Sequence, residues 1–142
     1  LEIVKKNSHQ FLLKGTLKYI HLDWRTHDWD AQLLNIEENK KFNIIVTNPP
    51  YIPSNDINFL ETEVKDYDPI LALDGGNDGL NAYRSIIPKL KNLVKPDGKI
   101  FVEIGRGQEN SVSEIALQHG ILSIDYKRDL SNIIRVIVFN IK

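Results

Sequence analysis

Apolar and polar residues alternate along this chain in a way that is strand-like in some segments and helix-like in others. Short runs rich in apolar and β-branched residues predict strands at 17–22, 42–47, 99–104, 121–126 and 133–139. Apolar residues at helical spacing predict helices at 1–13, 31–36, 80–94 and 108–119, with a further short helix near 57–64. Strands that alternate with helices indicate an α/β fold around a parallel sheet. The last two strands are joined by a link too short for a helical crossover, so we expect them to pair antiparallel.

The strongest helical pattern is the one at 80–94. Asp78 stands just before it and is a good N-cap residue. Pro88 lies inside it and is expected to kink the helix or divide it in two. The turn Lys95-Pro96-Asp97-Gly98 follows, and Gly15 and Gly120 are expected to end the helices before them.

A strand break at Asn48-Pro49-Pro50-Tyr51 is the most informative feature of the chain. Ile44, Ile45 and Val46 directly before it predict a strand buried on both faces. The two prolines end that strand, because neither can donate a ladder hydrogen bond. This places a carboxamide, free carbonyls and an aromatic ring at the carboxyl end of a strand, where open α/β sheets bind ligands. Such a group of acceptors can hold an NH2 group, and Tyr51 can cover a flat one.

Composition limits the class of protein without identifying it. The 142 residues have the length of one domain, and we expect 1–142 to be part of a single catalytic domain. The net charge of -1 argues against a dedicated nucleic-acid-binding module. Without cysteine there are no disulfides, and the four histidines have no metal-ligand spacing. No apolar run approaches a membrane span and no signal-peptide pattern is present, so we expect a cytoplasmic protein. The chain contains no methionine, and we expect it to be an internal piece of a longer protein.

Several motifs in order resemble the release-factor glutamine methyltransferases, a family of class I S-adenosylmethionine-dependent enzymes. Asn-Pro-Pro-Tyr alone also occurs in methyltransferases of DNA adenine and ribosomal RNA. The downstream match is more specific, and it consists of Glu63-Val64, Asp68-Pro69, Leu71-Ala72-Leu73, Gly75-Gly76, Asp78-Gly79-Leu80, Pro96-Asp97-Gly98, Glu103-Ile104-Gly105, Gln108 and Arg128-Asp129-Leu130. Asp23-Trp24 matches as well, whereas Asn132 stands where the family tends to have glycine.

The resemblance implies a Rossmann-like sheet with an antiparallel final strand pair, from which the first two strands are missing. It implies S-adenosylmethionine as methyl donor, and as substrate the glutamine of the Gly-Gly-Gln motif of peptide chain release factors. The cofactor's glycine-rich loop is then absent from this chain, which alone is expected to be inactive. A gap is expected between the strand at 17–22 and the strand before Asn48.

The resemblance also implies roles for individual residues. Asn48 and the Pro49 carbonyl hold the amide, while Pro50 and Tyr51 shape the substrate site. On the cofactor side, Asn48, Trp24 and Asp23 are expected to bind S-adenosylmethionine. Each of these residues also has a structural interpretation, such as a turn for Asn48 and core packing for Tyr51 and Trp24. Glycines 75, 76 and 79 are interpreted as turn residues, and Glu103 as structural.

Two other functions stay open. One is methylation of an adenine or guanine amino group, for which the chain lacks a basic surface or a recognition insert. The other is a catalytically dead remnant or binding module. No stable nucleic-acid partner, membrane or metal is expected.

Overall fold

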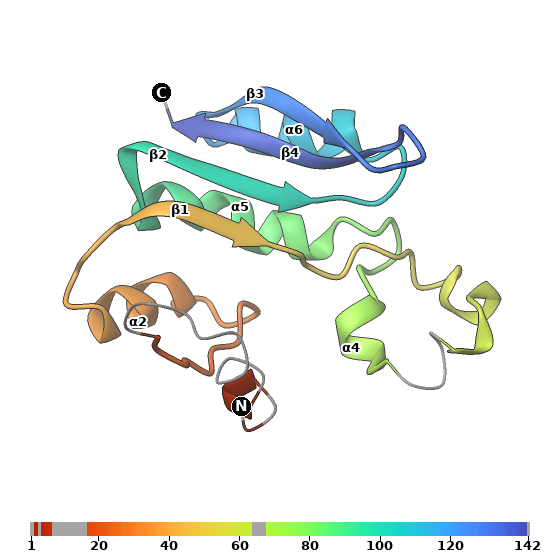
Figure 1. Ribbon diagram of the computed structural model, residues 1–142, viewed down its shortest axis with the longest axis horizontal. Coiled ribbons are helices and arrows are strands. Elements are labelled where there is room, and N and C mark those ends of the chain that lie inside the picture. Colours follow the sequence, from red (N-terminus) through yellow and green to blue (C-terminus); the bar gives the residue numbers. More distant parts are fainter. Residues whose placement is uncertain (1, 3, 7–16, 64–67, 142) are drawn as a thin grey trace.

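A computed structural model describes residues 2, 4–6, 17–63 and 68–141 of the chain. Most of them form a four-stranded sheet with helices beside it (Figure 1). In chain order the elements are α2 (Trp29–Ile36), β1 (Phe42–Thr47), the 3-10 helix η1 (Ile57–Phe59), α4 (Ile70–Leu73), α5 (Asn81–Leu93), β2 (Val94–Glu103), α6 (Glu109–Gln118), β3 (Ile121–Arg128) and β4 (Ile134–Ile141). The predicted helix at 1–13, its stop at Gly15 and the motif residue Val64 lie largely outside the described residues.

The sheet has the order β1-β2-β4-β3. β1 and β2 are parallel, and their register ends at the pair Thr47 and Val102. β4 runs antiparallel to both β2 and β3. The α/β class and the antiparallel final pair that the sequence predicts are therefore confirmed.

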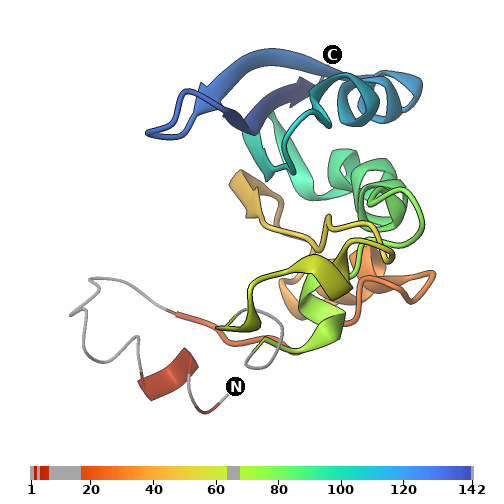
Figure 2. The ribbon, with the colours of Figure 1, turned by 90° about the vertical axis from the view of Figure 1, so that its right-hand side faces the viewer.

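The core lies between the sheet and the two long helices. α5 and α6 lie on the same side of the sheet (Figure 2). The predicted apolar face of α5 is buried, with Tyr83, Ile87 and Leu90 at most 1% exposed. Phe139 of β4 and Ile100 of β2 are fully buried against the same cluster. Burial of such side chains contributes about 1.5–3 kcal/mol each, so the contact between the helices and the sheet stabilises the domain.

Two details of α5 bear on its prediction. Pro88 does not divide the helix, because burial of a continuous apolar face outweighs one missing backbone hydrogen bond, and the kink stays a prediction. The N-cap is Leu80 and not Asp78. The Asp78 carboxylate instead accepts the Leu80 N–H at 3.1 Å and pairs with Arg84, so it fixes the turn before the helix.

The predicted turn at 95–98 lies inside β2. Pairing with β1 jumps from Val94 to Lys99 while β1 advances only from Phe42 to Ile44. The turn residues therefore bulge out of a strand that continues on both sides. The apolar residues of β2 remain in the sheet, as predicted.

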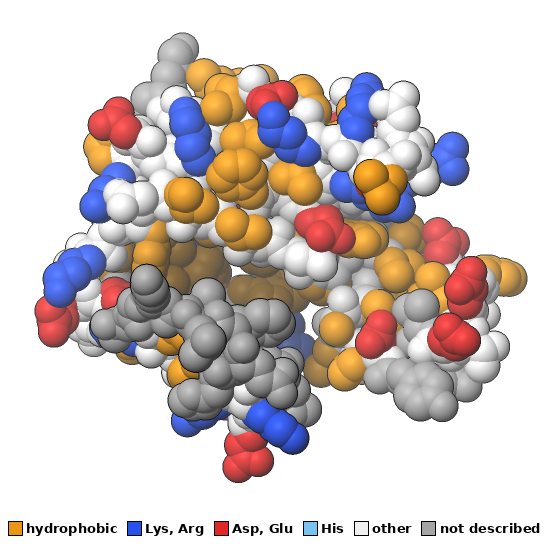
Figure 3. All heavy atoms as spheres, in the orientation of Figure 1, with side chains coloured by type: hydrophobic (Ala, Val, Ile, Leu, Met, Phe, Trp, Pro, Cys, Tyr) orange, Lys and Arg blue, Asp and Glu red, His pale blue; other side chains and the backbone are white. Residues whose placement is uncertain are grey.

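β1 is an edge strand in the part of the chain that the structure describes, and this overturns two predictions. Ile44 and Val46 are 61% and 75% exposed, so the strand is not buried on both faces. Figure 3 shows that this face of the sheet carries apolar side chains among basic ones. The predicted strand at 17–22 forms no strand, since it has no neighbour with which to exchange ladder hydrogen bonds.

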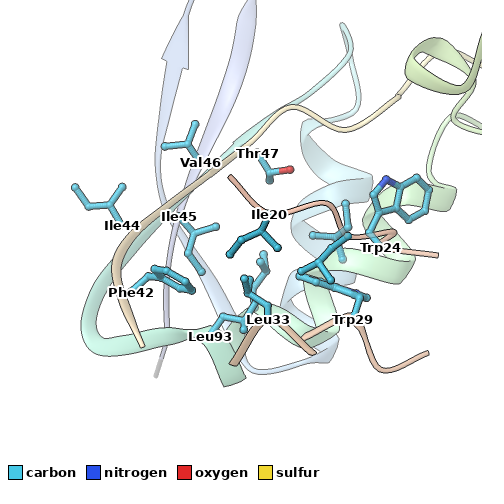
Figure 4. A pocket seen from close by; sticks show the side chains of 13 residues that line it. Ile20, Trp24, Trp29, Leu33, Phe42, Ile44, Ile45, Val46, Thr47 and Leu93 are labelled. Carbon is cyan, nitrogen blue, oxygen red and sulfur yellow. The ribbon is translucent and has the colours of Figure 1, made fainter. Parts of the chain in front are cut away.

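A cavity of about 440 Å³ separates residues 20–24 from β1. Figure 4 shows Ile45 and Phe42 directed toward Ile20 and Leu33, while Ile44 and Val46 point away. The cavity, called here the β1 cavity, is lined by Ile20, Leu22, Trp24, Trp29, Leu33, Phe42, Ile44, Ile45, Val46, Thr47, Ile86, Leu90 and Leu93. It lies at the place where the sequence predicts a gap in the sheet. No helix among the described residues is long and apolar enough to cross a membrane.

The β3–β4 turn depends on Asp129. Its Oδ1 accepts the Ser131 and Ile133 N–H groups at 2.8 and 3.0 Å, and its Oδ2 lies 3.1 Å from Arg135 Nε. Asn132 takes a φ of 63°, a conformation that favours glycine and that asparagine tolerates. This explains how asparagine can stand where the family tends to have glycine.

Replacing Asp129 by asparagine is expected to lower the melting temperature at neutral pH. The Ile133 N–H and Arg135 hold the pKa of Asp129 below its ordinary value of 3.8. A lowered carboxyl pKa stabilises the folded state above the ordinary pKa, and this stabilisation is lost as the pH falls through the lowered value. The difference between wild type and Asp129→Asn should therefore be largest near neutral pH and shrink in acid. Thermal unfolding of the full-length protein across pH measures it.

Asp97→Asn is the matched control. Asp97 is exposed, and its carboxylate makes no hydrogen bond to any described residue. The Asp97→Asn substitution should leave the melting temperature unchanged at every pH. Equal melting curves for Asp129→Asn and wild type at neutral pH would contradict the role given to Asp129.

Candidate functional site

Asn48, Pro49 and Pro50 leave the sheet at the carboxyl end of β1. Asn48 is exposed, whereas both prolines are buried. Among the described residues, none donates or accepts a hydrogen bond with the Asn48 side chain, and none donates to the Pro49 carbonyl oxygen. Both acceptors that the sequence assigns to the substrate amide are therefore free of intramolecular partners in this part of the chain.

Tyr51 is held from three directions. Its carbonyl oxygen accepts from Gln108 Nε2 at 3.0 Å. Its hydroxyl donates to Glu103 Oε1 at 3.3 Å, and its half-buried ring packs against the core. Burial and the neighbouring Glu103 carboxylate raise the pKa of the Tyr51 phenol, so it remains a protonated donor at neutral pH. The structure shows the core packing that is the alternative interpretation of Tyr51, and its role toward substrate stays a prediction.

The chain after Tyr51 is paired with the segment before α5. Ile52 N–H donates to the Leu73 carbonyl at 3.0 Å, and Gly75 N–H donates to the Ile52 carbonyl at 2.8 Å. Asp74 then accepts from the Ser54 hydroxyl at 2.7 Å and from the Gly76 N–H at 2.8 Å. These bonds lower the pKa of Asp74, the Ser54 hydroxyl most, and keep it ionised.

The glycines of this segment form turns, as the sequence predicts. Gly76 and Gly79 have φ values of 86° and 73°, which L side chains rarely adopt. A Cβ at Gly79 would meet the Tyr51 carbonyl oxygen and would lie 2.7 Å from Gln108 Nε2. Gly79 therefore lets two loops approach each other behind the Asn48–Tyr51 segment.

Tyr83 connects this region to the core. Its ring is fully buried, and its hydroxyl donates to the Glu103 backbone carbonyl at 3.0 Å. Burial raises the pKa of the Tyr83 phenol well above its ordinary value. The contact fixes the end of β2 beside Tyr51, which agrees with the structural role that the sequence gives Glu103.

Trp24 and Asp23 lie beside the edge of β1 that does not pair with β2. Trp24 lines the β1 cavity together with Thr47, the residue before Asn48, and Figure 4 labels both. It packs against the core but does not end a strand, because no strand forms there. The structure thus places Trp24 along the same cavity as the end of β1 without showing a contact to Asn48.

The Asp23 carboxylate is paired with Arg25. Arg25 Nε donates at 2.8 Å to Oδ1 and its Nη2 at 2.6 Å to Oδ2. These bonds lower the pKa of Asp23 to about 2, so it is ionised. The Arg25 backbone N–H also donates to Oδ1 at 3.0 Å and its Nε lies 3.1 Å from Oδ2, so Arg25 occupies both oxygens of the carboxylate. Asp23 lines a pocket with Leu22 and Trp24.

Two residues of this region were not predicted to act at the site. Gln108 was expected as the start of a helix and Gly79 as a turn, and both were named as part of the family match without a role at the site. Gln108 comes three residues after Gly105, at the end of the neighbouring strand, and this position is a usable signal because strand ends meet at one edge of the sheet. Within the described residues, no group of three His, Asp or Glu side chains could hold a metal ion.

Curated relatives carry one name repeatedly. The chain is 46% identical over 103 residues to a release factor glutamine methyltransferase of Clostridium acetobutylicum. The aligned part is 72% of this chain and 36% of the relative. The chain is 36% identical over 138 residues to the Caulobacter vibrioides protein of the same name, covering 97% of this chain and 45% of the relative. A bifunctional methyltransferase of Rickettsia conorii is 36% identical and covers 99% of this chain and 25% of its own length. The resemblance predicted from the motifs is confirmed, and the chain spans less than half the length of these relatives.

A solved structure supports the fold, and a family model shows the family. The crystal structure of M1.HpyAVI is similar with a TM-score of 0.51 at 12% identity, over 89% of this chain and 56% of that one, which supports the fold alone. The model described as Eco57I restriction-modification methylase matches residues 3–102. Since this match covers most of the chain, the protein belongs to the Eco57I restriction-modification methylase family.

Proposed function

We propose that the protein of which this chain is part transfers a methyl group from S-adenosylmethionine to a glutamine side-chain amide nitrogen. The substrate is the glutamine of the Gly-Gly-Gln motif in peptide chain release factors. The observation that carries the proposal is the pair of acceptors Asn48 and Pro49, which have no hydrogen-bond partner among the described residues and stand on a rigid turn at the end of β1. The names of the relatives support the choice of substrate.

The chemistry requires a positioned amide nitrogen. A carboxamide nitrogen is a poor nucleophile, because its lone pair is delocalised into the carbonyl. The Asn48 side-chain oxygen and the Pro49 carbonyl each accept one N–H of the substrate amide. Two such hydrogen bonds fix the nitrogen and favour its rehybridisation, so that the lone pair points at the methyl carbon. Positioning of this kind supplies roughly 7–11 kcal/mol in well-oriented reactions.

The residues around β1 fit the methyl donor in part. When bound, S-adenosylmethionine supplies an electrophilic methyl group on a sulfonium. Trp24 offers an indole along the apolar β1 cavity and would hold the flat adenosine. Asp23 would accept from the adenine amino group in exchange for part of its pairing with Arg25. Tyr51 would cover the substrate amide, and its ring would face the sulfonium for about 0.5–2 kcal/mol.

A nucleic-acid amino group is the second candidate acceptor, favoured by the name of the family model. The net charge of -1 and the repeated name of the relatives favour the protein substrate instead. Release factors work at the ribosome, so we expect the reaction to take place in the cytoplasm.

Asn48→Ala is expected to cut turnover roughly 100-fold or more, the scale for loss of one positioned hydrogen-bonding group. The affinity for S-adenosylmethionine should change little. Methyl transfer to release factor by the full-length enzyme, with calorimetry for the cofactor, measures both.

Asn43→Ala is the matched control, because Asn43 is an exposed asparagine at the other end of β1. It should keep wild-type turnover. Near-normal turnover by Asn48→Ala would contradict the role of Asn48 as an acceptor for the substrate amide.

Mass spectrometry of peptides from the treated release factor tests the substrate itself. The expected result is the added mass of one methyl group on the Gly-Gly-Gln peptide, located on the glutamine. Methylated DNA or RNA together with an unmodified release factor would overturn the protein substrate in favour of the second candidate.

Tyr51→Phe separates the ring from the hydroxyl. The hydroxyl contacts Glu103 and not the predicted substrate position, so we expect turnover within a few-fold of wild type. The melting temperature should fall with the loss of about 0.5–1.5 kcal/mol. Tyr51→Ala, which also removes the ring, should lose turnover. A Tyr51→Phe enzyme as inactive as Tyr51→Ala would show that the hydroxyl takes part in the reaction.

A further inference from the structure

The carboxamide of Gln108 lies directly behind the Asn48–Tyr51 segment. Its Nε2 donates to the Tyr51 carbonyl oxygen at 3.0 Å and to the Gly79 carbonyl oxygen at 3.3 Å. Its Oε1 accepts the Gly105 N–H at 2.9 Å. One side chain thus joins the loop after β1, the turn before α5 and the end of β2.

The orientation of this carboxamide is fixed by its partners. The Gly105 N–H can only donate and the two carbonyls can only accept, so the oxygen must face Gly105 and the NH2 must face Tyr51 and Gly79. The Tyr83 hydroxyl stands 3.4 Å from the same oxygen. Neither partner glycine leaves room for a larger residue, since a Cβ at Gly105 would lie 2.8 Å from Gln108 Oε1.

Gln108 is itself on a rigid support. It is the residue before α6, its N–H donates to the Gly105 carbonyl at 3.2 Å, and its carbonyl accepts from Val112 at 2.9 Å. Val112 is fully buried. The position of the Gln108 carboxamide is therefore set by the core.

The segment between the two fixed points is short and stiff. Thr47 is paired with Val102 in the sheet, and the Tyr51 carbonyl is held by Gln108. Only Asn48, Pro49 and Pro50 lie between them, and both prolines have φ near -65°. Gln108 holds the peptide that follows Tyr51, together with the pairing of Ile52 and the packed Tyr51 ring. Without the Gln108 hydrogen bond one of these supports is lost, and the turn that carries the Pro49 carbonyl gains freedom to shift.

We propose that Gln108 is a positioning residue of the methyl transfer, which sets the direction of the Pro49 carbonyl and the Asn48 carboxamide by holding the Tyr51 carbonyl. It does not contact the substrate. This inference rests on the proposed function, because it assigns those two acceptors to the substrate amide.

Gln108→Glu tests the donor without changing the size of the side chain. The new carboxylate would direct an oxygen at the Tyr51 and Gly79 carbonyls, so at alkaline pH it repels both. Burial raises the pKa of such a carboxyl, and in its protonated form it again donates one hydrogen bond. We expect kcat to fall at least 10-fold at alkaline pH and to recover toward acid, with the affinity for S-adenosylmethionine unchanged.

The wild-type pH profile is the reference for this test. Other titratable or charged groups face the same region from each neighbouring element, and they are present in both enzymes: Tyr51, Tyr83, Glu103 and Arg135. Gln118→Glu is the matched control, an identical change on the exposed end of α6, and should follow the wild-type profile. Gln108→Ala, which can neither donate nor repel, should show the reduced kcat at every pH.

The outcomes separate the two proposals. The measurement is methyl transfer to release factor by full-length enzymes, with circular dichroism to show that each is folded and calorimetry for the cofactor. A wild type that leaves the release factor unmethylated would overturn the proposed function. If the wild type is active and both Gln108→Glu and Gln108→Ala match its kcat at all pH values, the role of Gln108 is overturned and the proposed function stands. Loss of kcat together with loss of cofactor binding would show a general structural role and would also overturn it.

Discussion

The candidate site depends on a turn that is held at both ends. Its first end is Thr47, in the parallel ladder between β1 and β2, and its second is the Tyr51 carbonyl, which Gln108 holds at 3.0 Å. Between these points two prolines remove most of the remaining backbone freedom. An exposed carboxamide can keep one direction only on such a support, since asparagine on a free loop would lose its orientation to solvent. The buried prolines are therefore as important to the proposed chemistry as the exposed Asn48.

The support of this turn extends into the core. Tyr83 is fully buried on α5, and its hydroxyl holds the backbone at Glu103, whose side chain in turn accepts from Tyr51. The same helix begins just after the turn at Gly79, which packs directly behind Tyr51. α5, α6 and the end of β2 thus converge on one short segment. Because Tyr83 and Gln108 bind backbone carbonyls and Gly79 lies against the Tyr51 carbonyl, the backbone geometry tolerates little change at Gly79.

The edge of β1 that does not pair with β2 lacks such support among the described residues. In the part of the chain that the structure describes, β1 pairs only with β2, and Val46 is 75% exposed beside the β1 cavity. Apolar side chains and unpaired backbone groups at a sheet edge are costly in water and favour a covering element. The chain spans less than half the length of its curated relatives, and Trp24 lies across the cavity from the strand end that carries Asn48. Trp24, proposed for the cofactor, and Thr47, the residue before the proposed acceptor Asn48, therefore line one cavity.

The sequence by itself determined the elements whose pattern is local. The apolar face of α5, the strand before Asn48, the break at Pro49-Pro50 and the antiparallel final pair are all visible in spacing and in turn residues. It did not determine whether residues 17–22 form a strand or whether β1 is covered on both faces, because a strand exists only when a neighbour pairs with it. Gln108 is the clearest case of a role that depends on tertiary contacts. Its partners Tyr51, Gly79 and Gly105 are brought together by the sheet and α5, and no local pattern records a hydrogen bond between residues 57 positions apart.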